Sequence, residues 1–284
     1  MLLVVLPFAA AGVVLQAHWW AANAAPVAIW TVGLSGLFGL VVYQLRAATP
    51  GAAFAGAVIT ASLTFSTVNF PYKPWQTALI PSLFVFLLSF VATRMGRERK
   101  ERLGTAEKRT GRTAAQVAAN LGFAALVCEG LVQSSMTNTG WFVLNPASPM
   151  PLFAVGLAAL AEAAADTVSS EIGQVLGGRP RMITTLRAVE PGTDGAVSVA
   201  GTLAGMIAAG VVAGVGTVAM RGGLAMLAAS WAGAIFGLFF DSVLGATMER
   251  RGWLNNDAVN FLSTASAAGF AVGLLIVFSR NGLG

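Results

Sequence analysis

Long apolar stretches, separated by short polar segments, follow one another along the whole chain. A helix needs roughly 17–25 apolar residues to cross about 30 Å of bilayer hydrocarbon. Nine stretches reach or approach this length, namely residues 2–17, 26–45, 52–70, 76–95, 114–133, 149–168, 196–219, 222–244 and 258–278. The pattern predicts an all-α protein, a polytopic transmembrane helical bundle with about nine spans.

Composition supports a membrane location. Of the 284 residues, 56% are hydrophobic and only 10% are charged, and the mean hydropathy is +0.74. Soluble domains carry about 25% charged residues, so this composition excludes soluble enzyme classes. Cys128 is the single cysteine and His18 the single histidine, which argues against an intramolecular disulfide, a cysteine-based metal cluster and a histidine-rich metal site. The first apolar stretch lacks the positive start of a secretory signal, and we expect a short span there, with a cleaved or interfacial segment as the alternative.

The positive charges predict an orientation in the membrane. Eight of the 17 Lys and Arg residues lie within residues 94–112. Lys and Arg favour the cytoplasmic side, and nine spans with the N-terminus inside leave only Lys73, Arg221 and Arg280 outside. This topology accounts for the net charge of +5, so the charge does not indicate that the protein binds nucleic acid. We therefore expect a multi-pass protein of the cytoplasmic membrane of a prokaryote.

Basic and amide side chains recur around the start of the fifth predicted span. Lys108, Arg112, Gln116 and Asn120 follow one another at four-residue spacing, which places them on one face of a helix. Cations followed by amides suit a polyanion such as a phosphate chain. The alternative is that the cations only set the topology and the amides join helices.

Carboxylates gather at the ends of the sixth and eighth predicted spans. Glu162, Asp166 and Glu171 lie within ten residues, and Asp241 follows two phenylalanines. Ionisable residues at membrane depth are costly and usually functional. Carboxylates with hydroxyls, without His or Cys, favour a hard cation, Mg²⁺ above all. A proton relay or a cation-transport site would use the same residue types and stays open.

Two further segments add candidate ligands for a phosphate. A glycine-rich turn of Gly192, Thr193, Asp194 and Gly195 leads through Ser198 into the seventh predicted span, and the N–H groups at a helix start attract phosphate. A simple turn and helix cap is the alternative. Asn256 and Asn260 share a face at the start of the ninth span. With the predicted topology, all these groups lie at cytoplasmic span ends, and we expect them to form one site.

Glycines mark one face of the seventh predicted span. Gly201, Gly205, Gly210 and Gly214 form two pairs at four-residue spacing. Such pairs let neighbouring helices pack closely. A glycine face left free for a lipid tail is the alternative.

Taken together, these motifs resemble those of the membrane family of plant phytyl-phosphate kinase, which has prokaryotic and animal relatives. The matching runs are residues 108–120, 166–173, 191–198, 241–246 and 256–260. The resemblance extends from about Glu107 to the C-terminus, and Leu121 and Phe123 depart from the small residues expected after Asn120. It divides the chain into a four-span hydrophobic region (1–93), a basic cytoplasmic loop (94–113) and a motif-bearing catalytic membrane region (114–284).

The resemblance implies an integral membrane kinase that transfers the terminal phosphate of a nucleotide, CTP by preference, to an isoprenyl monophosphate such as phytyl or geranylgeranyl phosphate. On this hypothesis Asp166, Glu171 and Asp241 hold Mg²⁺, supported from behind by Glu162, Ser170 and Ser242. Lys108, Arg112, Ser198 and the 192–195 turn bind the nucleotide phosphates. Gln116, Asn120, Asn256 and Asn260 orient the nucleotide or the acceptor phosphate, and Asp166, Asp241, Lys108 and Arg112 are the catalytic residues. The isoprenoid tail would lie between helices, along the glycine face of the seventh span.

Two other functions use the same residue types. An ion- or proton-coupled transporter would place its acids near the membrane midplane and show an inverted repeat. A membrane cytidylyltransferase or a prenyl-alcohol kinase would also use Mg²⁺, but the cytidylyltransferase would release pyrophosphate. The expected partners are therefore a nucleoside triphosphate, an isoprenyl monophosphate and the bilayer, and no nucleic acid. The sequence does not set the oligomeric state.

Overall fold

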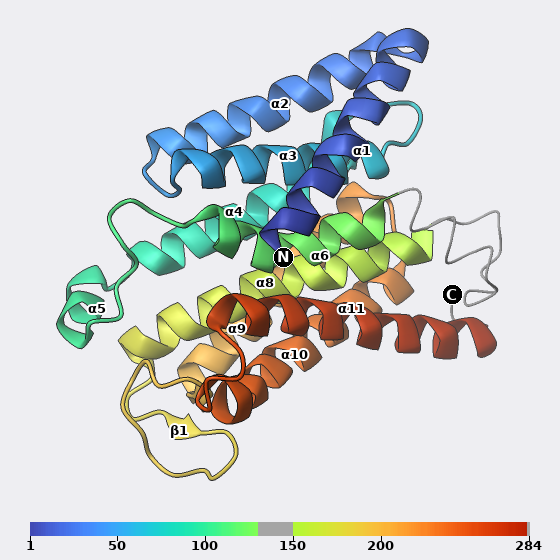
Figure 1. Cartoon of the computed structure of the whole chain (residues 1–284). Coiled ribbons are helices and arrows are strands. Elements are labelled where there is room, and N and C mark those ends of the chain that lie inside the picture. Colours follow the sequence, from blue (N-terminus) through green and yellow to red (C-terminus); the bar gives the residue numbers. More distant parts are fainter. Residues whose placement is uncertain (130–149, 283–284) are drawn as a thin grey trace.

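The computed structural model describes residues 1–129 and 150–282, and almost all of its regular structure is helical (Figure 1). The long helices are α1 (Leu2–Asn23), α2 (Ala25–Gln44), α3 (Pro50–Ser66), α4 (Leu79–Arg94), α6 (Ala114–Cys128), α8 (Met150–Leu176), α9 (Val199–Ala219), α10 (Leu224–Leu244) and α11 (Asn256–Arg280). The short elements are η1 (Pro74–Gln76), α5 (Arg97–Leu103), the π-helical turn η2 (Gly245–Glu249) and the antiparallel strands β1 (Arg181–Met182) and β2 (Ala196–Val197). The predicted all-α polytopic bundle is confirmed.

The predicted number of nine spans is not confirmed. Within the described ranges, six helices are long and apolar enough to cross a membrane, α1, α2, α8, α9, α10 and α11. A seventh is reached if α4 and α5, which meet at a bend of 67°, form one broken span. Helices α3 and α6 are apolar but only 17 and 15 residues long. The ends predicted at residues 130–133 and 149 lie outside the described residues.

Side-chain caps explain where several helices begin. The Ser198 hydroxyl accepts a hydrogen bond from the Gly201 N–H at 3.1 Å at the start of α9. In α6, Thr113 and Gln116 form a capping box, in which each side chain accepts from the other residue's N–H. Helix α6 therefore starts at Ala114. The predicted helical face is wrong for Lys108 and Arg112, which lie on the preceding loop.

Helix α8 is the central helix of the bundle. It packs against α4, α6, α9, α10 and α11, and its residues 154–165 are all buried. It ends at Leu176, eight residues beyond the predicted end, so Glu162, Asp166 and Glu171 all lie on one continuous helix.

Helix α9 packs tightly against α8. A methyl group added at Gly201 would lie 2.6 Å from the Ser169 carbonyl oxygen, and one at Gly205 would lie 2.7 Å from that of Ala165. Close helix packing is thus confirmed at these two glycines. The alternative of a face left free for a lipid tail is wrong for them.

The N-terminal helices form a layer on one side of α6 and α8 (Figure 1). A backbone bridge ties this layer to the loop before α6: the Arg112 N–H donates to the Ala47 carbonyl at 3.0 Å, and the Thr49 N–H donates to the Arg112 carbonyl at 3.0 Å. Gly111 has φ +76°, and a Cβ there would lie 2.3 Å from the Ala47 carbonyl carbon. Only glycine allows the two backbones to come this close. The bridge therefore holds Arg112 at a fixed position between the α2–α3 turn and the start of α6.

Candidate functional site

A cavity of about 390 Å³ at one end of the bundle is lined mainly by polar side chains. We call it the polar cavity. The sequence-predicted site residues on its wall are Arg112, Gln116, Asn120, Asp166, Ser170, Glu171, Gly192, Thr193, Asp194, Gly195, Ser198, Asp241, Ser242, Asn256 and Asn260. The structure thus brings together residues from α6, α8, α10, α11 and the turn before α9. Lys108 and Glu162 are the two predicted residues that do not line it.

The polar cavity has helix N-termini on one part of its wall and carboxylates on another. The first turns of α6 and α11 contribute Gln116 and Asn256, and the N-cap of α9 contributes Ser198. Helix N-termini carry partial positive charge and bind anions. The carboxylates Asp166 and Asp241 come instead from the C-terminal halves of α8 and α10. One side of the cavity therefore suits phosphate and the other a cation.

The carboxylate oxygens on the acidic part of the wall are ligands that suit a divalent cation. Asp166, Asp194, Asp241 and Glu249 all line the polar cavity. The Asp241 Oδ1 atom is buried and has no hydrogen-bond partner. A buried, unpartnered carboxylate oxygen is costly unless a cation or donor meets it. Within residues 1–129 and 150–282, no three His, Cys, Asp or Glu side chains already surround a common metal position.

Glu162 lies behind the cavity, one turn before Asp166. Its side chain is 1% exposed, and its Oε1 atom has no hydrogen-bond partner. A methyl group added at Gly237 of α10 would lie 2.6 Å from the Glu162 Cγ atom. Glu162 is therefore packed between α8 and α10, and its supporting role stays a prediction.

Arg112 and two asparagines join distant segments at the cavity wall. The Arg112 Nη2 atom donates to the Thr167 hydroxyl at 3.2 Å. The Asn260 amide donates to the Asn120 Oδ1 atom at 3.4 Å, and the Asn120 amide donates to the Gln116 carbonyl at 2.8 Å. These bonds hold the loop before α6 against α8, and α6 against α11, at the site. Gln116 also serves as part of the α6 cap, as described above.

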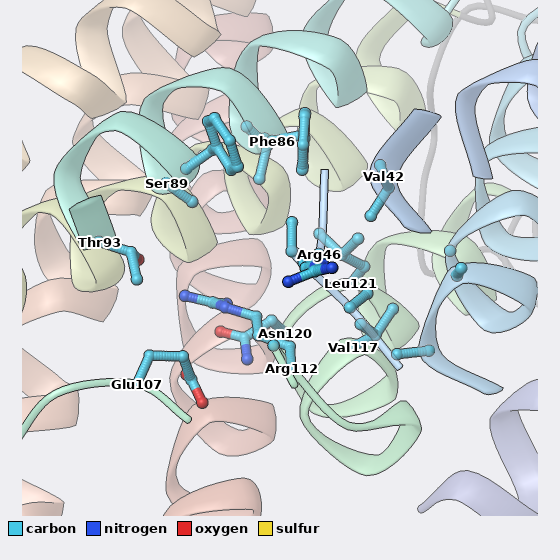
Figure 2. Close-up of a pocket in the computed structure, with 18 of the residues that line it drawn as sticks. Val42, Arg46, Phe86, Ser89, Thr93, Glu107, Arg112, Val117, Asn120 and Leu121 are labelled. Atoms are coloured by element: carbon cyan, nitrogen blue, oxygen red, sulfur yellow. The ribbon is translucent and has the colours of Figure 1, made fainter. Parts of the chain in front are cut away.

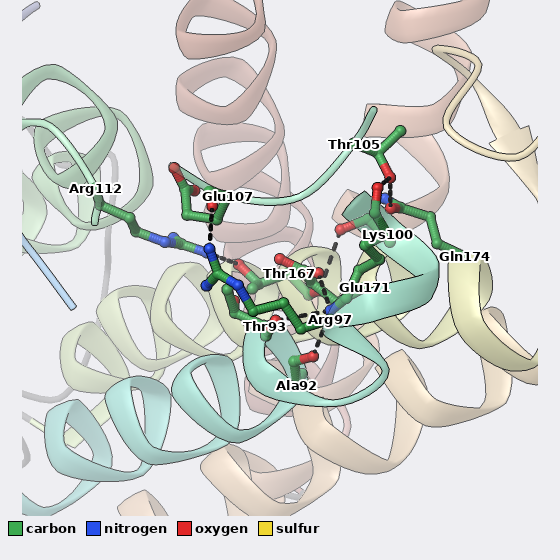
Figure 3. Close-up of polar contacts among 11 residues, drawn as sticks. Ala92, Thr93, Arg97, Lys100, Thr105, Glu107, Arg112, Thr167, Glu171 and Gln174 are labelled. Atoms are coloured by element: carbon green, nitrogen blue, oxygen red, sulfur yellow. Dashed lines mark hydrogen bonds and ion pairs between the residues drawn. The ribbon is translucent and has the colours of Figure 1, made fainter. Parts of the chain in front are cut away.

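A buried ion pair lies next to the polar cavity (Figure 3). The Lys100 ammonium group donates to Glu171 Oε2 at 2.6 Å and to the carbonyls of Ala92 and Thr93 at 2.9 and 2.8 Å. Lys100 is only 1% exposed, so α5 and the end of α4 are tied to α8. Sequence reasoning missed Lys100 because nothing in its spacing separates it from the other basic residues of the loop. The predicted metal-binding role of Glu171 stays a prediction, and the partner observed here is Lys100.

Other residues on the polar cavity wall were also missed. The Thr105 hydroxyl and the Gln174 side chain are hydrogen-bonded to each other, which joins the basic loop to α8 (Figure 3). Glu107 lines the cavity from the same loop, and Glu249 lines it from η2. The pairing of Glu249 with Asp241 at two-turn spacing is the one signal in the sequence that could have found any of them.

A second cavity, of about 550 Å³, lies between α2, α3, α4 and α6 (Figure 2). We call it the amphipathic cavity because one part of its wall is apolar and another is basic. The apolar part includes Phe38, Val42, Ala52, Val85, Phe86 and Leu121, and the basic part consists of Arg46, Arg94, Arg97, Lys108, Arg109 and Arg112. Lys108 thus lies on this cavity. Arg112, Asn120 and Glu107 line both cavities, so the two adjoin there.

The chain belongs to a family of integral membrane proteins. The family model described as integral membrane protein DUF92 matches residues 33–268. This match includes every site residue named above and all of α3, but neither α1 nor the start of α2. No solved structure matches the chain.

Relatives of the chain occur in archaea, cyanobacteria and plants. An uncharacterized membrane protein of Methanocaldococcus jannaschii, MJ0933, is 35% identical over 70% of this chain and 75% of its own length. Two Arabidopsis thaliana proteins also match. Protein PGR is 30% identical over 79% of this chain and 80% of its own length, and the chloroplastic protein VTE6 is 32% identical over 63% and 52%. The resemblance noted from the motifs is therefore confirmed at the level of the family.

Proposed function

We propose that this protein is an integral membrane kinase that transfers the terminal phosphate of a nucleoside triphosphate, CTP by preference, to an isoprenyl monophosphate such as phytyl or geranylgeranyl phosphate. The observation that carries the proposal is the polar cavity, where carboxylates of α8 and α10 face Arg112 and three helix N-termini. This combination of charges suits a metal-bound polyphosphate. The resemblance to the phytyl-phosphate kinase family supports the same reaction.

The reaction needs positioning and charge neutralisation more than proton transfer. An oxygen of the acceptor phosphate attacks the terminal phosphorus of the nucleotide, the bond from that phosphorus to the bridging oxygen breaks, and the nucleoside diphosphate leaves. The acceptor is already ionised at neutral pH, because the second pKa of a phosphate monoester is about 6. No general base is required, which agrees with a polar cavity that His18 does not line.

Named residues take the remaining roles. Asp166 and Asp241 would hold Mg²⁺, with Asp194 and Glu249 next to them. Bound Mg²⁺ supplies charge neutralisation of the nucleotide phosphates. Arg112 and the N–H groups at the start of α9 stabilise the transferred phosphate. We place this end of the bundle at the cytoplasmic face, since α5 and the β1–β2 segment, both with basic residues, lie at the same end (Figure 1).

The test is product analysis with purified protein in detergent, CTP, Mg²⁺ and geranylgeranyl monophosphate. We expect CDP and geranylgeranyl diphosphate in equal amounts, with both products lost in Asp166→Asn and Asp241→Asn. Asp257→Asn is the matched control, because Asp257 lies in the first turn of α11 and lines neither cavity.

Other outcomes contradict the proposal. Pyrophosphate release would indicate cytidylyl transfer, and turnover with the prenyl alcohol alone would indicate an alcohol kinase. If the protein consumes no nucleotide with any of several prenyl phosphates, the carboxylates would be assigned to ion coupling instead. Ion flux into liposomes would then be measured next.

A further inference from the structure

We propose that the amphipathic cavity is the binding site for the isoprenyl monophosphate, with the phosphate at Arg46 and Arg112 and the tail between α2, α3 and α4. This inference rests on the proposed function and adds the location of the acceptor. It gives the N-terminal helices, which carry no motif, a direct part in substrate selection.

The charge on the cavity wall requires an anion. Six cationic side chains and one carboxylate, Glu107, line the cavity. Within the described parts of the chain, no hydrogen bond or ion pair engages the side chains of Arg46, Lys108 or Arg109. Figure 2 shows the Arg46 side chain among the residues that line the cavity. Unpaired guanidinium groups beside an apolar wall match a phosphate head attached to an apolar tail.

The shape and composition of the rest of the cavity match the tail. Beyond the basic residues the wall is mainly apolar, with phenylalanine, valine, alanine and glycine of α2, α3 and α4. The same helices also contribute four hydroxyl side chains, Thr60, Ser82, Ser89 and Thr93. The volume of about 550 Å³ lies within the range of roughly 300–1,000 Å³ for sites that enclose a small molecule. The glycine face of α9 does not offer such a space at Gly201 and Gly205, since α8 already packs against both.

The position of the cavity brings the two phosphates together. Arg112 and Asn120 line both cavities, so a phosphate bound at Arg112 in the amphipathic cavity adjoins the nucleotide site. Phosphoryl transfer requires the attacking oxygen close to the terminal phosphorus. A single guanidinium group at the junction can contact both phosphates.

Gly56 of α3 allows a direct test of the tail site. Gly56 lines the amphipathic cavity, and a Cβ added there meets no atom within 4 Å. In Gly56→Leu the new side chain therefore occupies the cavity without displacing the backbone. We expect the KM for geranylgeranyl monophosphate to rise about tenfold, with less than about threefold change for the shorter geranyl monophosphate and no change for CTP.

Gly33→Leu is the matched control. Gly33 of α2 is also helical, its added Cβ also meets no atom within 4 Å, and it lines neither cavity. Its KM values should equal those of the unmodified protein. Arg46→Gln provides the second variant and tests the phosphate: the KM should rise about tenfold for every isoprenyl monophosphate regardless of tail length, again with no change for CTP.

A binding experiment without nucleotide separates this inference from the kinase proposal. A photoreactive geranylgeranyl monophosphate, added to the unmodified protein alone, should label peptides from α2, α3 and α4. Labelling restricted to α9 and α10 would overturn the inference even if the kinase is active, as would unchanged KM values in Gly56→Leu and Arg46→Gln. Labelling of α2 to α4 without any nucleotide turnover would support the site and refute the kinase.

Discussion

The polar cavity and the amphipathic cavity adjoin, yet they are built from different kinds of sequence. Carboxylates, amides and a glycine-rich turn, drawn from segments more than one hundred residues apart, line the polar cavity. Alanine, glycine, valine and phenylalanine of α2 to α4 form most of the apolar wall of the amphipathic cavity, and its cations come from the basic loop and the α2–α3 turn. Polar residues at membrane depth are rare, and so they mark a site. Small apolar residues also serve ordinary helix packing, so their presence does not mark a site.

The two cavities are also held in place differently. The polar cavity is centred on α8, whose neighbours pack around it on several sides. The basic part of the amphipathic cavity is tied to α8 by the Lys100–Glu171 pair and to α2 and α3 by the Ala47–Arg112 bridge. The following predictions test these ties and the separate roles of the cavities, from the largest expected effect to the smallest.

Removing Lys100 should have the largest effect, on stability. Lys100→Met leaves Glu171 without its buried partner, which costs about 3 kcal/mol or more, so the apparent Tm in detergent should fall by roughly 6–12 °C. The double variant Lys100→Met with Glu171→Gln removes both charges and should regain part of this loss. An unchanged Tm in the single variant would show that the pair does not hold α5 against α8.

Asp166→Asn and Asp241→Asn should affect the polar cavity alone. We expect kcat to fall about 10²–10³-fold and the Mg²⁺ concentration for half-maximal rate to rise, because each change removes a charged oxygen that we propose holds Mg²⁺. Binding of geranylgeranyl monophosphate without nucleotide, measured by photolabelling, should stay at the level of the unmodified protein. Equal loss of acceptor binding and of turnover would contradict the separation of the two cavities.

Arg112→Lys should affect both substrates, since Arg112 lines both cavities. Lysine keeps the charge but loses the planar two-pronged donor group. We expect kcat/KM for CTP and for geranylgeranyl monophosphate to fall together, each by about 10–100-fold. This behaviour differs from Gly56→Leu, which should change only the acceptor. A change confined to one substrate would place Arg112 in a single cavity.

Gly111→Ala should have the smallest effect, a lower Tm together with weaker activity. The left-handed conformation costs an alanine about 1–2 kcal/mol, and the new methyl group also collides with the Ala47 backbone. Gly104→Ala is the matched control, because Gly104 has φ +71° in the same loop but open space around its Cβ. Both variants should lose stability, and only Gly111→Ala should lose activity, because it displaces Arg112. Equal activities would argue against that displacement.

Much of the bundle could be predicted because long apolar runs end at recognisable caps. The starts of α9 and α11 agree with the predicted spans to within three residues, since Ser198 and Asn255 cap them. The end of α8 was predicted too early because Ser169, Ser170 and Glu171 have the composition of a loop. These polar residues stay helical where α8 passes the polar cavity.

Residues that line the polar cavity could be predicted where chemistry, rather than spacing, identified them. Asp166 and Asp241 stood out because carboxylates among apolar residues need a partner. Lys108 was assigned to a helical face because its spacing is helical, but Gly111 breaks that periodicity. Lys100 looked like one more topogenic cation, and only the folded chain shows that it is buried. The amphipathic cavity could not be predicted, since its apolar residues resemble those of any span.

The most direct test of the central claim is to follow the terminal phosphate of CTP with a radioactive label. With geranylgeranyl monophosphate, Mg²⁺ and the purified protein in detergent, we predict that the label enters geranylgeranyl diphosphate in an amount equal to the CDP formed. Label found in pyrophosphate or in free phosphate, with none in the isoprenyl product, would contradict the account.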